Sequence, residues 1–574
     1  MRKLLVYLRD YKKETVLGPL FKLLEASFEL FVPLVVAAIV DTGIGNGDRG
    51  YILWMCALLV GLGVVGLVCA ITAQYFAAKA SVGFATKLRR ALFSHIQSLS
   101  FTEMDTIGSS TLITRMTSDL NQVQSGLNLF LRLFLRSPFV VFGAMIMAFT
   151  VDVKAALIFA VTIPLLSVVV FGIMLWSIPM YQKVQAALDK VLGTTRENLT
   201  GVRVIRAFGQ EEEERERFSE RNDTLTKLQT FVGRVSALMN PVTYIIINLA
   251  IVAVIWVGGV QVDTGVLTQG EVVALVNYMS QILVELIKLA NLIISVTKAV
   301  ACARRVSAVM DIQSSMEDSG TVEPADSEDA IVFDHVCLTY KNAGAESLSD
   351  ISFTVKKGET VGIIGGTGSG KSSLVGMIPR FYDATAGRVL VNGVDVKEQP
   401  LSALRDRVGI VMQKAVLFKG SIRDNLLWGK RDATEEEMYR TLDIAQAREF
   451  VDQKSRGLDE YVEQGGKNLS GGQRQRLTIA RTLIRDPEIL ILDDSASALD
   501  FATDARLRAA IREHSENMTV LIVSQRASTV LHADKILVLD DGELAGIGRH
   551  DELIETCPVY QEIYYSQFPK EVKA

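Results

Sequence analysis

The chain has 574 residues, of which 49% are hydrophobic and 22% are charged, and its formal net charge is −5. This length exceeds that of a single hydrophobic core and indicates at least two large units. The hydrophobic fraction is high for a soluble protein, whereas the charged fraction is too high for a chain buried wholly in lipid, so we expect the charges to be segregated. The small net charge, without a basic stripe, argues against nucleic acid as a partner.

The first residues, MRKLLVYLRDYKKE, are basic and interrupt their apolar run with charged side chains. They have no small-residue cleavage site, so they lack the pattern of a signal peptide. We expect an amphipathic helix at the membrane interface that leads into a first span.

Six apolar segments before residue 300 are long enough to cross a bilayer, which needs about 20 mostly apolar residues. The expected spans are 16–40, 52–76, 129–151, 155–180, 235–260 and 272–296. The first, third and fifth connections are short and hold few Lys or Arg residues, whereas the second and fourth are long and basic. The positive-inside bias therefore predicts that both long connections and both termini lie in the cytoplasm.

Both long connections contain amphipathic, proline-free segments, 81–99 and 181–199, which indicate helical hairpins that project from the membrane. A polar segment with Gly and Pro then separates the last span from a soluble half. We expect a transmembrane domain over residues 1–300, a linker over 301–330 and a second domain over 331–574.

The soluble half alternates strand-like and helix-like segments. Short apolar runs at 361–364, 488–494 and 520–525 are typical of buried parallel strands. The predicted fold class is a membrane all-α six-helix domain fused to a cytosolic α/β P-loop nucleotide-binding domain.

The sequence GGTGSGKS at 365–372 matches GxxxxGK[ST] between an apolar strand and a helix-like segment, which is the context that a phosphate-binding loop requires. Its glycines let backbone N–H groups surround phosphates, Lys371 reaches the β- and γ-phosphates, and Ser372 coordinates Mg²⁺. Further along, an apolar strand ends at Asp493, which is placed to hold Mg²⁺ through water. The sequence therefore predicts ATP and Mg²⁺ as ligands.

LSGGQ follows at 469–473, and with this motif the chain resembles the ATP-binding-cassette family. The resemblance implies that Tyr340 stacks on adenine, that Gln413 senses Mg²⁺ and that residues 497–500 form the D-loop. It also implies that two half-transporters enclose two ATP molecules, each held by the phosphate loop of one chain and the signature of the other. The ATP-binding residues expected here are Tyr340, Gly365, Thr367, Gly368, Ser369, Gly370, Lys371, Ser372, Ser373, Gln413, Asp493, Ser470, Gly471, Gly472 and Gln473, and the metal-binding residues are Ser372, Gln413 and Asp493.

Two positions depart from the pattern of the family. Asp494 stands where a catalytic glutamate is usual, so the carboxylate is drawn back by roughly an ångström, a displacement that can cost about a hundredfold in rate. Gln525 stands where the switch histidine is usual, and a glutamine side chain cannot carry charge or shuttle a proton. Asp494 and Gln525, beside an intact LSGGQ, resemble the degenerate half of bacterial heterodimeric multidrug exporters.

The predicted function is therefore one subunit of an ATP-driven exporter in the bacterial plasma membrane, which moves a small amphiphile. Its own site binds ATP and hydrolyses it slowly, while its signature completes the site of a second half-transporter with the usual glutamate and histidine. Two alternatives remain open from the residues, a homodimeric exporter with slow turnover and a regulatory nucleotide-binding subunit of an importer or lipid flippase.

Charged side chains inside spans are costly and are functional candidates. Glu25 and Glu29 share one face of the first span, as Arg132 and Arg136 share one face of the third, so a bridge between the two spans would neutralise both pairs. Glu285 in the last span is expected to pair with Lys288. The other interpretation is a substrate cavity lined by Glu25, Glu29, Arg132, Arg136 and Glu285.

Overall fold

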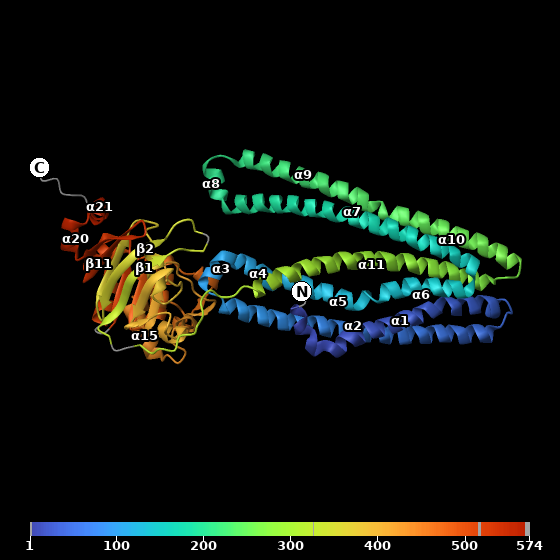
Figure 1. The fold of residues 1–574 in the computed structure, drawn as a ribbon, viewed down its shortest axis with the longest axis horizontal. Coiled ribbons are helices and arrows are strands. Elements are labelled where there is room, and N and C mark those ends of the chain that lie inside the picture. The colour runs from blue at the N-terminus through green and yellow to red at the C-terminus, as the bar shows by residue number, and fades with distance from the viewer. Residues whose placement is uncertain (1–2, 325–326, 342, 515–517, 569–574) are drawn as a thin grey trace. The chain divides into compact units, whose positions relative to one another are not determined.

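The computed structural model describes residues 3–324, 327–341, 343–514 and 518–568. The chain folds into two compact units (Figure 1). The first unit contains Met1–Gln97 and Ser110–Ile312, and the second contains Ser98–Ser109 and Gln313–Ala574.

The first unit is entirely helical over its described residues. Six of its helical segments are long and apolar enough to cross a membrane, which confirms the all-α six-span prediction. Its elements are a 3₁₀ helix at Leu4–Tyr11, α1 (Lys12–Ala38), a π-helical turn at Ile39–Ile44, α2 (Arg49–Ser98), α4 (Ser109–Thr114), a π-helical turn at Arg115–Asp119, α5 (Leu120–Leu133), α6 (Arg136–Val151), α7 (Val153–Thr200), α8 (Val202–Ala207), α9 (Glu211–Ala237), α10 (Met239–Asp263) and α11 (Gln269–Met310).

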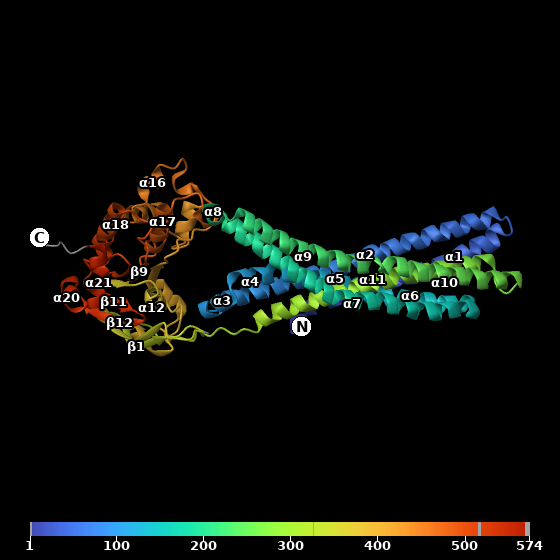
Figure 2. The ribbon, with the colours of Figure 1, turned by 90° about the horizontal axis from the view of Figure 1, so that it is seen from above.

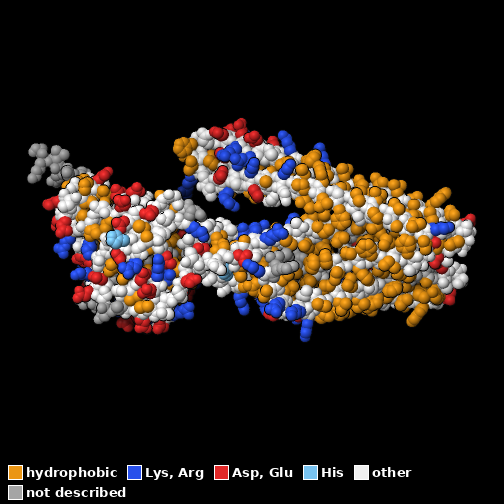
Figure 3. Space-filling model, viewed as in Figure 1, with side chains coloured by type: hydrophobic (Ala, Val, Ile, Leu, Met, Phe, Trp, Pro, Cys, Tyr) orange, Lys and Arg blue, Asp and Glu red, His pale blue; other side chains and the backbone are white. Residues whose placement is uncertain are grey.

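Small residues let the helices of the bundle approach closely. Ala144, Ala156 and Ala274, on α6, α7 and α11, are completely buried, and small side chains at such positions favour close helix packing in lipid. The Tyr278 hydroxyl donates to the Leu30 carbonyl at 2.7 Å, which ties α11 to α1. Hydrophobic side chains cover the outer surface of the spans, and charges gather on the distal parts of α7 and α9 (Figure 3).

The helices α7 and α9 form a long hairpin whose tip is the short helix α8 (Figures 1 and 2). Val204 and Phe208 at this tip are 60% and 74% exposed. An apolar tip of this kind is suited to docking against another surface.

The hydrogen-bond ladder of the third span is interrupted between α5, which ends at Leu133, and α6, which begins at Arg136. Phe134 and Leu135 keep helical backbone angles, so the segment remains one span. Pro138 lacks the N–H that would bond to the carbonyl of Phe134, which accounts for the interruption.

The second unit contains two main sheets and confirms the predicted α/β nucleotide-binding fold. A six-stranded sheet has the order β12-β11-β3-β10-β9-β6 and is parallel except for β12. A four-stranded antiparallel sheet has the order β2-β1-β4-β5. The strands are β1 (Asp329–Leu338), β2 (Leu348–Lys356), β3 (Thr360–Gly365), β4 (Ala386–Val391), β5 (Val394–Asp395), β6 (Val408–Val411), β7 (Gly420–Ser421), β8 (Tyr461–Val462), β9 (Ile489–Asp493), β10 (Thr519–Val523), β11 (Lys535–Asp540) and β12 (Glu543–Gly548).

Helices surround the sheets of this unit. They are α3 (Phe101–Ile107), α12 (Lys371–Met377), α13 (Leu401–Arg407), α14 (Ile422–Leu427), α15 (Glu435–Ile444), α16 (Arg448–Asp452), α17 (Gly471–Leu483), α18 (Phe501–Glu513), α19 (Ala527–Val530), α20 (His550–Thr556) and α21 (Pro558–Gln567), with 3₁₀ turns at Gly457–Asp459 and Gln464–Gly466. The alternation of buried strands with helices puts the carboxyl ends of β3, β9 and β10 at one edge, where parallel α/β sheets bind ligands.

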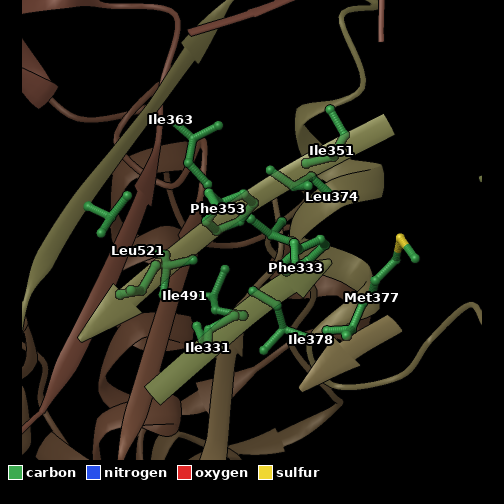
Figure 4. Packing of buried hydrophobic residues seen from close by; sticks show 14 of the residues in the cluster. Ile331, Phe333, Ile351, Phe353, Ile363, Leu374, Met377, Ile378, Ile491 and Leu521 are labelled. Carbon is green, nitrogen blue, oxygen red and sulfur yellow. The ribbon is translucent and has the colours of Figure 1, made fainter. Parts of the chain in front are cut away.

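The main core of the second unit lies between its two sheets and α12 (Figure 4). Phe333 of β1 and Phe353 of β2 stack with ring centroids 4.6 Å apart. Their rings lie in one cluster with Ile491 of β9 and Leu521 of β10 (Figure 4). This core fixes the strands that carry the site.

The short helix α3 belongs to the second unit although it follows directly after α2 in the chain. The Phe101 ring lies 4.6 Å from that of Phe381, and the Tyr382 hydroxyl donates to Asp105 at 2.7 Å. Glu103 is buried and accepts hydrogen bonds from Ser100 and from Ser315 in the segment after α11. These contacts attach α3 to the sheet unit through apolar and polar groups together.

Candidate functional site

The phosphate-binding loop connects β3 to α12. Gly368 and Gly370 have φ angles of +87° and +91°, which L-residues with side chains rarely adopt. The Lys371 ammonium is buried and donates to the carbonyls of Gly365 at 2.9 Å and Gly366 at 2.5 Å, and to the Ser369 hydroxyl. Burial lowers the pKa of Lys371 below its usual value. The loop therefore holds its cation inward, within reach of a phosphate placed on the backbone nest.

The groups expected to hold Mg²⁺ meet at the edge of the sheet. The Ser372 hydroxyl donates to Asp493 at 3.0 Å, and the Gln413 amide donates to Asp494 at 3.3 Å. Burial raises the pKa of Asp493 and of Asp494 above the usual aspartate value. Hydroxyl, amide and carboxylate oxygens are the ligands that Mg²⁺ prefers, so this donor set fits the metal.

A cavity of about 430 Å³ opens over the loop. The structure brings together there most of the residues predicted for the nucleotide, namely Tyr340, Thr367, Gly368, Gly370, Lys371, Ser372, Ser373, Gln413, Asp493, Asp494 and Gln525. Sequence analysis missed Glu346, Ser347, Asp541 and Gly542, which also line it. The Asp541–Gly542 turn between β11 and β12 was the available signal for two of them.

Tyr340 lies at the rim of this cavity. Its hydroxyl bonds with that of Ser373 at 2.8 Å, and its ring meets the Tyr382 ring edge-on at 5.1 Å. A half-buried ring at the mouth of the phosphate site is suited to stacking on a base.

The signature residues lie outside this cavity. Ser470 caps α17, because its hydroxyl accepts from the Gln473 N–H at 3.2 Å while the Gln473 side chain accepts from the Ser470 N–H at 3.0 Å. Gly471 and Gly472 form the first turn of this helix. The arrangement presents a capped helix N-terminus, which is an anion-binding feature, away from the chain's own phosphate loop.

The two atypical residues line the same cavity as the phosphate loop. Asp494 has a φ of +44°, and its N–H donates to the Val523 carbonyl at 3.0 Å. Gln525 has an exposed side chain just after β10. Their positions place a short carboxylate and a neutral amide beside the residues expected to hold metal and phosphate.

The charges of the spans form a network that agrees only in part with the sequence expectation. Arg136 bonds to Glu29 at 2.6 Å and to Glu285 at 2.5 Å, so the bridge between the first and third spans exists there. Ser137 donates to Glu285 at 2.9 Å, and Lys288 pairs with Glu285 at 2.8 Å.

The expected neutralisation of Glu25 by the third span is wrong. Glu25 pairs with Lys22 one turn earlier on the same helix, and Arg132 makes no ion pair with any described residue. Glu25 pairs within α1 because residues three apart, such as Lys22 and Glu25, are neighbours on a helix surface.

The fold and the site define a phosphate-loop nucleotide-binding domain joined to a six-span membrane domain. The family model for the ABC transporter transmembrane region matches residues 15–286, and that for the ABC transporter matches 348–497. An uncharacterized ABC transporter ATP-binding protein of Mycobacterium tuberculosis is 37% identical over 98% of this chain and 97% of its own length. The chain therefore belongs to the ABC transporter family, as a half-transporter with one membrane region and one cassette.

Two further relatives extend the comparison. An ATP-dependent lipid A-core flippase of Chromobacterium violaceum is 29% identical over 99% of this chain and 97% of its own length. The solved structure of a bacterial Atm1-family ABC exporter with ATP bound superposes with a TM-score of 0.79 at 23% identity, and covers 98% of this chain and 99% of that one. The latter likeness confirms the fold.

The residues present fit MgATP, which cassettes of this family bind. Lys371 and the loop N–H groups would hold the phosphates, while Ser372 and Asp493 would hold Mg²⁺, which neutralises phosphate charge. Asp494 and Gln525 would flank the terminal phosphate. The side chain of Asp494 is one methylene shorter than that of glutamate, so its carboxylate would lie farther from an attacking water molecule. Gln525 can donate a hydrogen bond but carries no charge.

Proposed function

We propose that this chain is the impaired-site half of a heterodimeric ATP-driven exporter of small amphiphiles. One observation carries the proposal: Asp494 and Gln525 line the same cavity as an intact set of phosphate and metal ligands. Binding requires the intact groups, whereas hydrolysis requires the two that depart from the family pattern. The chain thus retains ATP at its own site and turns it over slowly.

The second half of the proposal concerns the partner. LSGGQ is complete, its Ser470 is exposed, and none of its residues lines the chain's own cavity, which supports a role at the nucleotide of a second half-transporter. That partner would supply the catalytic glutamate and the switch histidine.

We place the dimer in the bacterial plasma membrane with both termini in the cytoplasm, because the long basic connections favour that side. Relatedness to a lipid A-core flippase favours a lipid-like amphiphile as one class of cargo. A homodimer with two slow sites is the competing candidate.

The test compares two changes in this chain, measured as steady-state ATPase of the heterodimer that copurifies. A bulky residue at Gly472 should nearly abolish turnover, because it obstructs the fast site of the partner. Asp494→Asn should cost far less, because that carboxylate contributes little to the steady-state rate. If Asp494→Asn were as damaging as the glycine change, the assignment of the impaired site to this chain would be wrong.

Gly471→Val gives a cleaner version of the first change. A Cβ added at Gly472 would lie 3.1 Å from the Ala498 carbonyl of the same chain, whereas one added at Gly471 would meet only the Ala498 Cβ at 3.7 Å. An added Cβ at Gly471 therefore disturbs its own chain less than one at Gly472, so a loss of turnover in Gly471→Val points to the surface presented to the partner, and Gly471→Ala is its smaller companion change.

A further inference from the structure

The switch segment, residues 524–527, has unusual backbone anchoring. The Ser524 N–H donates to the Ile363 carbonyl at 3.0 Å, which continues the pairing of β10 with β3. The Arg526 N–H donates to the Ser524 hydroxyl at 3.0 Å. These bonds leave the Gln525 carbonyl and the Ala527 N–H to find partners outside the segment.

One side chain from the other end of the cassette satisfies both groups. The Gln567 amide nitrogen donates to the Gln525 carbonyl at 2.8 Å, and the Gln567 amide oxygen accepts from the Ala527 N–H at 2.8 Å. The amide thus spans the peptide units on both sides of Arg526. It also caps α19, whose own N-cap residue makes no side-chain bond.

The helix that carries Gln567 is itself fixed. Tyr560 of α21 is completely buried in a cluster with Leu553, Cys557 and Ile536, so the helix is packed against β11. Gln567 is the last residue of this helix and its side chain is exposed, so its position is defined by the packed helix backbone together with its two hydrogen bonds to the switch segment.

The opposite side of the switch segment contacts the start of α18. The Arg526 guanidinium lies 4.9 Å from the centre of the Phe501 ring, directly after the D-loop. Gln567 thus holds the backbone of the segment and Phe501 contacts its Arg526 side chain, while Ser524 and Gln525 line the nucleotide cavity.

We propose that Gln567 is a positioning residue for the ATP site, which fixes the peptide units on both sides of Arg526, directly after Gln525, so that the Gln525 side chain stays beside the terminal phosphate. Rotation of the segment breaks both hydrogen bonds at once. The C-terminal helix α21 is thereby a direct structural support of the nucleotide site. The proposal holds whether this site is slow or fast, and so is independent of the asymmetry proposed above.

The first test is hydrogen exchange of the full-length chain, in detergent with whichever half-transporter copurifies. Gln567→Ala should raise exchange in peptides that cover the switch segment by about fivefold, since each lost hydrogen bond shifts the local opening equilibrium several-fold. Gln561→Ala is the matched control, because its amide lies on the same helix and donates to the carbonyls of Ile554 and Glu555 instead. Its exchange in the switch segment should stay unchanged.

The second test follows the release of MgATP from this chain's site after rapid dilution. Gln567→Ala should speed release several-fold without changing the association rate, because the phosphate loop is untouched. Gln567→Glu should act at least as strongly, because its carboxylate can accept from Ala527 but repels the Gln525 carbonyl. Unchanged exchange in Gln567→Ala, or equal changes in Gln561→Ala, would overturn the proposal, as would a Gln567→Glu variant that behaves as wild type.

Discussion

Asp493 and Asp494 are neighbouring carboxyl groups at the expected metal site, and both have shifted pKa values. Burial raises the pKa of both carboxyl groups, so each takes up a proton at a higher pH than an ordinary aspartate. A raised pKa also means that the folded chain without ligand binds protons more tightly than the unfolded chain. At a pH above the folded-state pKa, this pair therefore lowers the free energy of unfolding, and the effect is lost as the pH falls through the folded-state pKa.

The raised pKa values of Asp493 and Asp494 predict how the binding of MgATP depends on pH. Protons compete with Mg²⁺ for the same oxygens, so Mg²⁺-dependent ATP affinity should begin to fall on acidification at a pH above the ordinary aspartate range. Affinity measured with excess chelator should change much less on the same acidification. Titration of a fluorescent ATP analogue at each pH, with and without Mg²⁺, would check this, and parallel curves would contradict it.

The sequence predicted the phosphate loop, the metal ligands and the adenine-side tyrosine as one site, because each follows a strand end of a recognisable motif. The sequence could not indicate that Glu346 lines the cavity or that Gln567 bonds to the segment beside it. These residues reach the site from turns and from a distant helix, and such contacts depend on tertiary packing that leaves no local pattern.

Among the elements, α1, α6 and α11 are joined by the Arg136 network. Arg136→Met should destabilise the bundle, because it removes the partner that Glu29 shares with the buried Glu285 and leaves Glu285 with only Lys288 and Ser137. Arg132→Met is the matched control and should change stability little, because Arg132 has no ion pair among the described residues. Thermal unfolding in detergent would compare the two, and equal midpoints would show that the network is not structural.

The hydropathy of residues 129–151 does not reveal where the hydrogen-bond ladder of the third span is interrupted, and only Pro138 marks that place. The partner of Glu25 was also beyond the reach of the sequence. Glu25 has possible partners on its own helix and on a neighbouring helix, and sequence spacing cannot decide between them.

At the scale of the whole molecule, a single chain holds one phosphate loop and one signature that do not meet. Expressed alone, the chain should therefore have little ATPase activity, since any homodimer would repeat Asp494 and Gln525 in both sites. The measurement is phosphate release by the purified chain against the copurified heterodimer. Robust turnover by a pure homodimer would refute the heterodimer proposal.

The Arg136 network also sets an order of events during synthesis. Glu29 emerges before Arg136, but Glu285 follows 149 residues later. At the usual rate of translation this delay is roughly 10 s. During that time, Glu29 is the only acid of the network that can pair with the Arg136 guanidinium of the third span. An unpaired arginine at the centre of a span costs about 2.5–3.5 kcal/mol to insert. Until the last span is synthesised, the first span thus supplies the only acidic partner of Arg136 in this network, and Glu285 of the last span then completes the network.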